Sequence, residues 1–178
     1  MSTIWAIDDE SIPNTAFAHR RLAKGDTVVD LATGSITLSA SAYTYREDGM
    51  SVYVSTAMED QGVEDVELID WSKHKLARVT VEVVRRQDAG EPYSKNPRAG
   101  TVAAGEEVET AGGVILDEAS EPDDERIRKS HGLIRIEDRP PARTLWTAFR
   151  HKLIQGSQVK PSESSSWEDA AGDLAAAS

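Results

Sequence analysis

Short runs of alternating apolar and polar residues, separated by turn-forming residues, constrain the fold of this chain more than any other feature. Side chains alternate between the two faces of a strand, so such runs predict strands with one buried face. The strongest run spans residues 76–84, with valines at 79, 81 and 83. Residues 34–45 also alternate, and Asp48-Gly49 precedes a further extended run at 50–54, which together predict a β-hairpin.

One helix and two further strands complete the expected elements. Residues 113–116 and 132–136 are short apolar runs that favour strands. Prolines at 140 and 141 suit a first helical turn, and the apolar side chains that follow are spaced along one helical face, at Leu145, Trp146, Phe149 and Leu153. The chain is therefore expected to have an α+β fold: a small mixed or antiparallel sheet with a C-terminal amphipathic helix, residues 141–155, packed on it.

The domain organisation follows from length and local composition. The chain has 178 residues and no cysteine, so its stability must come from an apolar core rather than from disulfides. We expect a single domain over residues 1–155, interrupted by a long loop or excursion at about 87–125 that is rich in Gly, Pro, Glu and Ala. Residues 156–178 are polar and small, which predicts a disordered acidic tail.

The charge and the apolar pattern limit the partners. A net charge of −11 makes direct binding to nucleic acid unlikely, because such binding needs a cationic face. No secretory leader and no run of about 20 apolar residues is visible, so we expect no membrane partner and a cytoplasmic location. Another protein, encoded nearby, is the partner that this composition favours, and the oligomeric state stays open.

The charges are segregated along the chain. Residues 99–125 hold nine acidic residues and no basic one, whereas residues 126–155 hold eight basic and two acidic residues. These two surfaces either neutralise one another within the fold or meet a partner protein. For the second alternative the predicted partner-binding residues are Arg126, Arg128, Lys129 and, in the tail, Trp167.

Familiar enzyme motifs are missing from the sequence. It contains no phosphate-binding Gly-rich loop, no nucleophile elbow and no His-Glu-x-x-His, and its four histidines are widely scattered. We therefore predict no cofactor and no metal site, and read the acidic run Asp8-Asp9-Glu10 as a solvated segment. Enzymatic activity is left uncertain, with its absence favoured.

The densest polar cluster is His19-Arg20-Arg21. If these residues form a strand, His19 and Arg21 share one face and Arg20 lies on the other. Arginine and histidine at a strand end can bind phosphate or carboxylate, although pairing with acidic loops would explain them equally. The candidate catalytic residues are His19, Arg20, Ser51 and His131, with Arg21 as a ligand-binding residue.

Several short motifs resemble those of small uncharacterised bacterial proteins that have no assigned activity. The resemblance is carried, in patches, by residues 18–22 (AHRRL), 39–43 (SASAY), 48–53 (DGMSVY) and 131–134 (HGLI). A second resemblance is to ADP-ribosyltransferase-like folds, in which an early strand supplies His or Arg and a later strand supplies Ser. It would place His19 or Arg20 and Ser51 in a nicotinamide cleft, with Glu82 available as the acid.

Three functions follow as hypotheses. The first is a non-enzymatic bacterial accessory or protein-interaction protein that acts through its segregated acidic and basic surfaces and its C-terminal tail. The second is an enzyme or binding protein for a phosphorylated or nucleotide ligand. The third is an acidic mimic of nucleic acid that blocks a basic partner.

Overall fold

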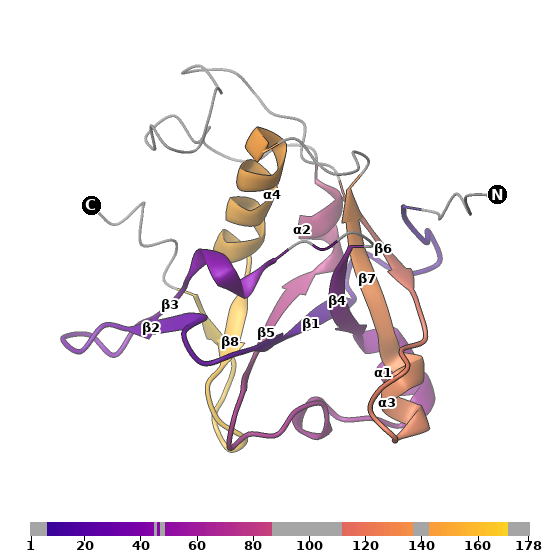
Figure 1. Ribbon diagram of the computed structural model, residues 1–178, viewed down its shortest axis with the longest axis horizontal. Helices are drawn as coiled ribbons and strands as arrows, with labels where there is room; N and C mark the ends of the chain where they lie inside the picture. The colour runs from indigo at the N-terminus through magenta and orange to yellow at the C-terminus, as the bar shows by residue number, and fades with distance from the viewer. Residues whose placement is uncertain (1–6, 45, 47–48, 87–111, 137–142, 171–178) are drawn as a thin grey trace.

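A seven-stranded antiparallel sheet organises the part of the chain that the computed structural model describes, residues 7–44, 46, 49–86, 112–136 and 143–170 (Figure 1). The strand order is β6-β7-β4-β1-β5-β8-β9. The strands are β1 (Phe17–Leu22), β4 (Met50–Val54), β5 (Lys75–Thr80), β6 (Gly112–Leu116), β7 (His131–Ile136), β8 (Gln158–Lys160) and β9 (Glu168–Asp169). The helices are α1 (Ser55–Gln61), α2 (Val81–Arg85), α3 (Glu125–Ser130) and α4 (Arg143–Gln155), with 3₁₀ turns η1 (Ala40–Ala42) and η2 (Asp65–Glu67).

The two faces of the sheet differ in what covers them. One, the core face, carries Ala18, Val52 and Ala77 and packs in the larger apolar core with side chains of α2 and α4. The opposite face, here the polar face, carries His19, Tyr53 and Arg78 in the same strands. A smaller cluster, to which α1, α3, β5 and the segment between α1 and β5 contribute, covers part of it and is built from Met58, Val63, Leu68, Leu76 and Ile127. The α+β prediction is confirmed, as is the helix that was expected to end at Gln155.

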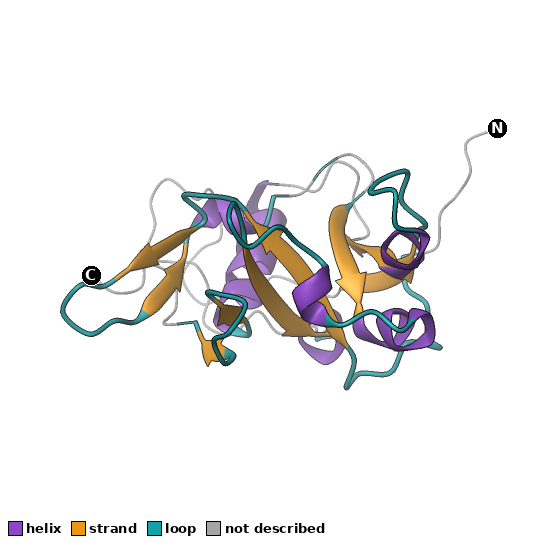
Figure 2. Ribbon diagram, turned by 90° about the horizontal axis from the view of Figure 1, so that it is seen from below, coloured by secondary structure: helices purple, strands orange, loops and turns teal. Residues whose placement is uncertain are grey.

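A separate two-stranded hairpin extends away from this body (Figures 1 and 2). It is formed by β2 (Thr27–Val29) and β3 (Ile36–Leu38), with Val29 opposite Ile36 and Thr27 opposite Leu38. Ile36 and Leu38 are buried in the larger core and fix the base of the hairpin to the body. Its outer part has no such support.

The expected strand at 76–84 is only half correct. The strand ends at Thr80, and the next residues form α2. The Thr80 hydroxyl accepts a hydrogen bond from the Val83 backbone N–H at 3.3 Å and so caps the helix. Val81 and Val84 are buried there, so packing of a helical face overrides the strand preference of valine.

The hairpin expected from residues 34–45 and 50–54 is wrong. β3 is only three residues long and pairs with β2, whereas β4 pairs with β1 and β7. Ser39, directly after β3, still bonds the segment before β2: its backbone N–H donates to the Asp26 carbonyl at 2.9 Å and its hydroxyl donates to the Gly25 carbonyl at 3.0 Å. The chain then turns into η1 instead of continuing as a strand.

The predicted start of the disordered tail, residue 156, is also too early in the chain. Residues 158–160 form β8, which pairs with β5, and Val159 is fully buried in the larger core. An added strand needs only one inward apolar side chain at this length, so the polar composition of the segment concealed it. Residues 171–178, the remainder of the predicted tail, and residues 87–111 of the predicted excursion lie outside the described residues.

None of the helices in the described ranges has the length and apolar character needed to cross a membrane.

Candidate functional site

A row of polar side chains crosses the polar face of the sheet. Strand register places Gln158 opposite Arg78, Arg78 opposite His19, His19 opposite Tyr53, and Tyr53 opposite His131. Directly paired residues in antiparallel strands project from the same face, so these side chains lie side by side. We call Gln158, Arg78, His19, Tyr53 and His131 the polar row.

Within the polar row, Arg78 is held by three neighbouring side chains. Its guanidinium carbon lies 4.1 Å from the ring centre of Phe17 and 4.2 Å from that of Trp167. Its Nε donates a hydrogen bond of 2.9 Å to the Gln158 side-chain oxygen. Trp167 is in turn fixed by a hydrogen bond of 3.1 Å from its indole N–H to the Asp65 carboxylate. Two aromatic rings and one amide therefore set the orientation of the guanidinium.

His19 lies next to Arg78 and is buried, with only 4% of its surface exposed. Trp167 covers it edge-on, with the ring centres 5.6 Å apart. Burial, and then the nearby Arg78 charge, lower the pKa of His19 to about 4, so the ring is neutral near pH 7. Its Nδ1 has no hydrogen-bond partner within the described chain.

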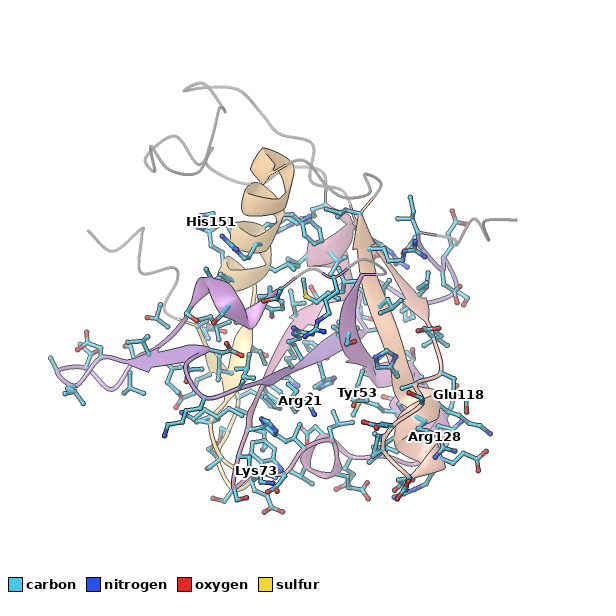
Figure 3. The ribbon with its side chains drawn as sticks, viewed as in Figure 1. Arg21, Tyr53, Lys73, Glu118, Arg128 and His151 are labelled. Atoms are coloured by element: carbon cyan, nitrogen blue, oxygen red, sulfur yellow. The ribbon has the colours of Figure 1, made fainter. Side chains whose placement is uncertain are left out.

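Three of the four predicted catalytic residues share the polar face. His19 and His131 belong to the polar row, and continuing the β1–β4 register places Ser51 opposite Arg21, two residues further along. Figure 3 shows Arg21 and Tyr53 close together on this side, and Arg21 counteracts the rise that burial causes in the pKa of Tyr53. His131 Nδ1 lies 2.6 Å from the Asp117 carbonyl oxygen.

Arg20 does not join them. Its side chain lies on the opposite face, as the strand alternation predicts, where Nε donates to the Ala42 carbonyl at 3.1 Å and Nη1 donates to the Ser51 carbonyl at 2.8 Å. These bonds tie η1 to β4 and use two of the five N–H donors of Arg20. A catalytic role for Arg20 stays a prediction, on the face opposite to that of His19, Ser51 and His131.

The resemblance to ADP-ribosyltransferase-like folds stays a prediction, but Glu82, the acid available for it, lies apart from Ser51 along the sheet. Glu82 lies in α2, after Thr80, and Thr80 pairs with Phe17 at the start of β1. Ser51 lies opposite Arg21, four residues further along β1, which is about 13 Å at the usual rise of a strand. The chain therefore does not bring Glu82 to Ser51.

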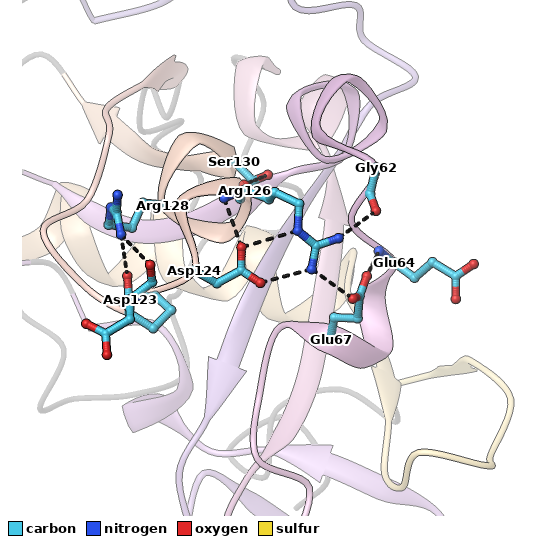
Figure 4. A network of polar contacts seen from close by, with 9 residues as sticks. Gly62, Glu64, Glu67, Asp123, Asp124, Arg126, Arg128 and Ser130 are labelled. Atoms are coloured by element: carbon cyan, nitrogen blue, oxygen red, sulfur yellow. Dashed lines mark hydrogen bonds and ion pairs between the residues drawn. The ribbon is translucent and has the colours of Figure 1, made fainter.

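The basic residues of α3 contact acidic residues of the same chain (Figure 4). Arg126 Nη2 lies 2.9 Å from Asp124 and 3.2 Å from Glu67, and Lys129 lies 2.9 Å from Glu125. Arg128 donates to the backbone carbonyls of Pro122 and Asp123. These contacts agree with mutual neutralisation within the fold. Partner binding by Arg126, Arg128, Lys129 and Trp167 stays a prediction.

The acidic segment near the N-terminus is part of the structure. Asp8 accepts hydrogen bonds from the Val114 backbone N–H at 3.0 Å and from Arg85 Nε at 3.1 Å, so it joins β6 to α2. Asp9 accepts from Ser11, which lowers the pKa of its carboxyl group. Within the described residues, no group of three metal-binding side chains comes together.

The tip of the β2–β3 hairpin is a second candidate site. Among the described residues, four large apolar side chains are exposed, and three lie here: Val28 at 40%, Val29 at 44% and Leu31 at 98%. Hydrogen bonds order the tip. The Asp30 backbone N–H donates to the Ser35 carbonyl, and the Asp30 carbonyl accepts from the Gly34 N–H. The Asp30 carboxylate accepts from the Ala32 N–H at 2.8 Å.

No protein-family model, curated protein or solved structure matches the chain.

Sequence reasoning missed Arg78, Tyr53 and Leu31. Arg78 lies in the strand expected at residues 76–84, but its aromatic neighbours come from β1 and from a segment that was predicted to be tail. Leu31 carried a usable signal, since it is a lone leucine in a Gly- and Thr-containing turn, where an apolar side chain has no core to enter.

Proposed function

We propose that this chain is a protein-interaction protein and that the tip of its β2–β3 hairpin is the docking element. The observation that supports this most directly is the exposure of Leu31, 98%, in an ordered tip that stands off the body. An apolar side chain in water adds nothing to folding, and clustered apolar exposure is typical of interaction sites. Val28 and Val29, on opposite faces of β2, are exposed next to this tip.

The order of the tip favours a docking role over a flexible linker. The backbone bonds from Asp30 N–H to the Ser35 carbonyl, 2.9 Å, and from Gly34 N–H to the Asp30 carbonyl, 2.7 Å, close the loop. Gly34 has φ of +74°, which a glycine adopts without strain. Because the loop is already ordered, a partner need not supply the free energy of ordering it.

The occupant that fits is a partner protein with an apolar pocket bordered by basic residues. Residues 26–38 contain two aspartates, Asp26 and Asp30, and no lysine or arginine. The whole chain carries a net charge of −11, so electrostatic attraction would steer it toward a cationic rim. The excess of acidic residues therefore contributes long-range attraction, while the hairpin supplies the apolar anchor.

Substitution at the tip tests this function. Tagged wild type, Leu31→Asp, Leu31→Met and Leu116→Asp are expressed in the native host, and the proteins that co-purify are quantified. Leu116 is the control because, within the described ranges, it is the remaining exposed large apolar residue, 47% exposed on β6. We expect the same partner with wild type, Leu31→Met and Leu116→Asp, and at least a tenfold loss with Leu31→Asp alone. Binding of that purified partner should weaken as salt is raised.

Thermal unfolding of each variant shows whether the loss reflects docking, since a substitution at so exposed a site should change stability by no more than about 0.5 kcal/mol. Equal recovery with Leu31→Asp and wild type would contradict the proposal. So would a stable dimer of the pure protein that Leu31→Asp converts to monomer, because the occupant would then be a second copy of this chain.

A further inference from the structure

We infer that Arg78 is an anion-binding residue, and that its guanidinium receives an oxyanion, carboxylate or phosphate, on the polar face of the sheet. This site is separate from the hairpin tip and stands independently of the proposed docking function. Its elements are Arg78 from β5, Phe17 from β1, Gln158 from β8, and Trp167 just before β9.

The Arg78 guanidinium is held in one orientation. Contacts of 4.1 and 4.2 Å to two aromatic rings restrict its plane, and the Gln158 bond to Nε fixes its rotation within that plane. A guanidinium held in this way loses little side-chain entropy when it binds a planar or tetrahedral oxyanion through two parallel hydrogen bonds.

The Arg78 guanidinium also has no counter-ion among the described residues. In a chain with 31 acidic residues, Arg78 has no carboxylate within 4 Å among the described residues, and neither Nη atom has a hydrogen bond there. Asp65 is close enough to favour the charged form, but its carboxylate accepts the Trp167 N–H instead. The two Nη atoms are therefore available for an external acceptor.

The surroundings contain further unpaired polar groups. The neighbouring His19 Nδ1 is buried without a partner, and Arg21 is exposed on the same face with no ion pair to the described residues. Strand geometry puts Arg21 and Arg78 at diagonal positions, roughly 7–8 Å apart at the backbone. A second cation on the same face favours an anion over a neutral ligand.

Arginine side-chain NMR on the intact protein tests the site. The Nε–Hε signal of Arg78 is assigned by its loss in Arg78→Lys, and that of Arg126 by its loss in Arg126→Lys. Inorganic phosphate and acetate are titrated separately at constant ionic strength. We expect the Arg78 signal to shift in a saturable manner with at least one anion, and the anion that binds more tightly identifies the class of ligand.

Isothermal titration with the same anions gives the affinities. Arg78→Lys keeps the charge but loses the two-pronged donor, so we expect at least a tenfold weaker affinity, while Arg126→Lys binds as wild type does. Arg126 is the matched control because Asp124 and Glu67 already neutralise it. An Arg78 signal that neither anion moves, or an Arg126 signal that moves equally, would overturn the inference, and so would unchanged affinity in a folded Arg78→Lys.

Discussion

At the residue scale, His19 couples folding to pH. Its folded-state pKa of about 4 lies below the ordinary value of 6.5, so the unfolded chain binds more protons between these two values. Stability therefore rises with pH through this window and is lost as pH falls from about 6.5 to about 4. The full difference corresponds to about 3 kcal/mol. Asp65, which is close to His19, works against this shift, and Arg78 reinforces it.

His19→Phe is expected to remove this dependence, because it keeps an aromatic ring beside Trp167 but cannot take up a proton. Urea unfolding at pH 7.0 and pH 4.5 should show wild type losing roughly 2–3 kcal/mol more than the variant between the two pH values. The difference between proteins cancels the carboxylates that titrate in both. Equal losses would mean that His19 is not buried as a neutral ring.

At the scale of elements, the segment after α4 belongs to the sheet. β8 pairs with β5, and Trp167 packs on the smaller apolar cluster and on Arg78. Trp167→Ala removes these contacts, so we expect it to lower the free energy of unfolding by roughly 2–4 kcal/mol. Ser164→Ala, an exposed position in the same segment, is the control and should stay within about 0.5 kcal/mol of wild type. Equal free energies of unfolding for wild type, Trp167→Ala and Ser164→Ala in denaturant would contradict this packing and support the prediction of a disordered tail.

What the sequence could predict depended on how local each signal was. β6, β7 and α4 have their apolar residues in a single continuous stretch, so their existence could be predicted directly, whereas the strand at His19–Arg21 was only a conditional prediction. α2 could not, because its helix rests on a threonine cap and on contacts with α4. β8 could not, because its partner β5 lies some 80 residues earlier. The polar row could not be predicted for the same reason. Four of the five strands that carry it were predicted in whole or in part, but their order in the sheet was not.

At the scale of the whole molecule, folding neutralises the start of the basic stretch. Arg126 contacts Glu67 and Asp124, and Lys129 contacts Glu125. These pairs are exposed to solvent, which screens them, so they contribute little to stability. The molecule as a whole is acidic, with a net charge of −11, and its β2–β3 hairpin projects an apolar tip.

Hydrogen–deuterium exchange with and without the co-purified partner tests the central claim that this hairpin docks. We expect the partner to slow exchange over residues 27–38 and to leave β1 and β5 unchanged. Slowed exchange confined to α3, where Arg126, Arg128 and Lys129 lie, with none in the hairpin, would contradict it.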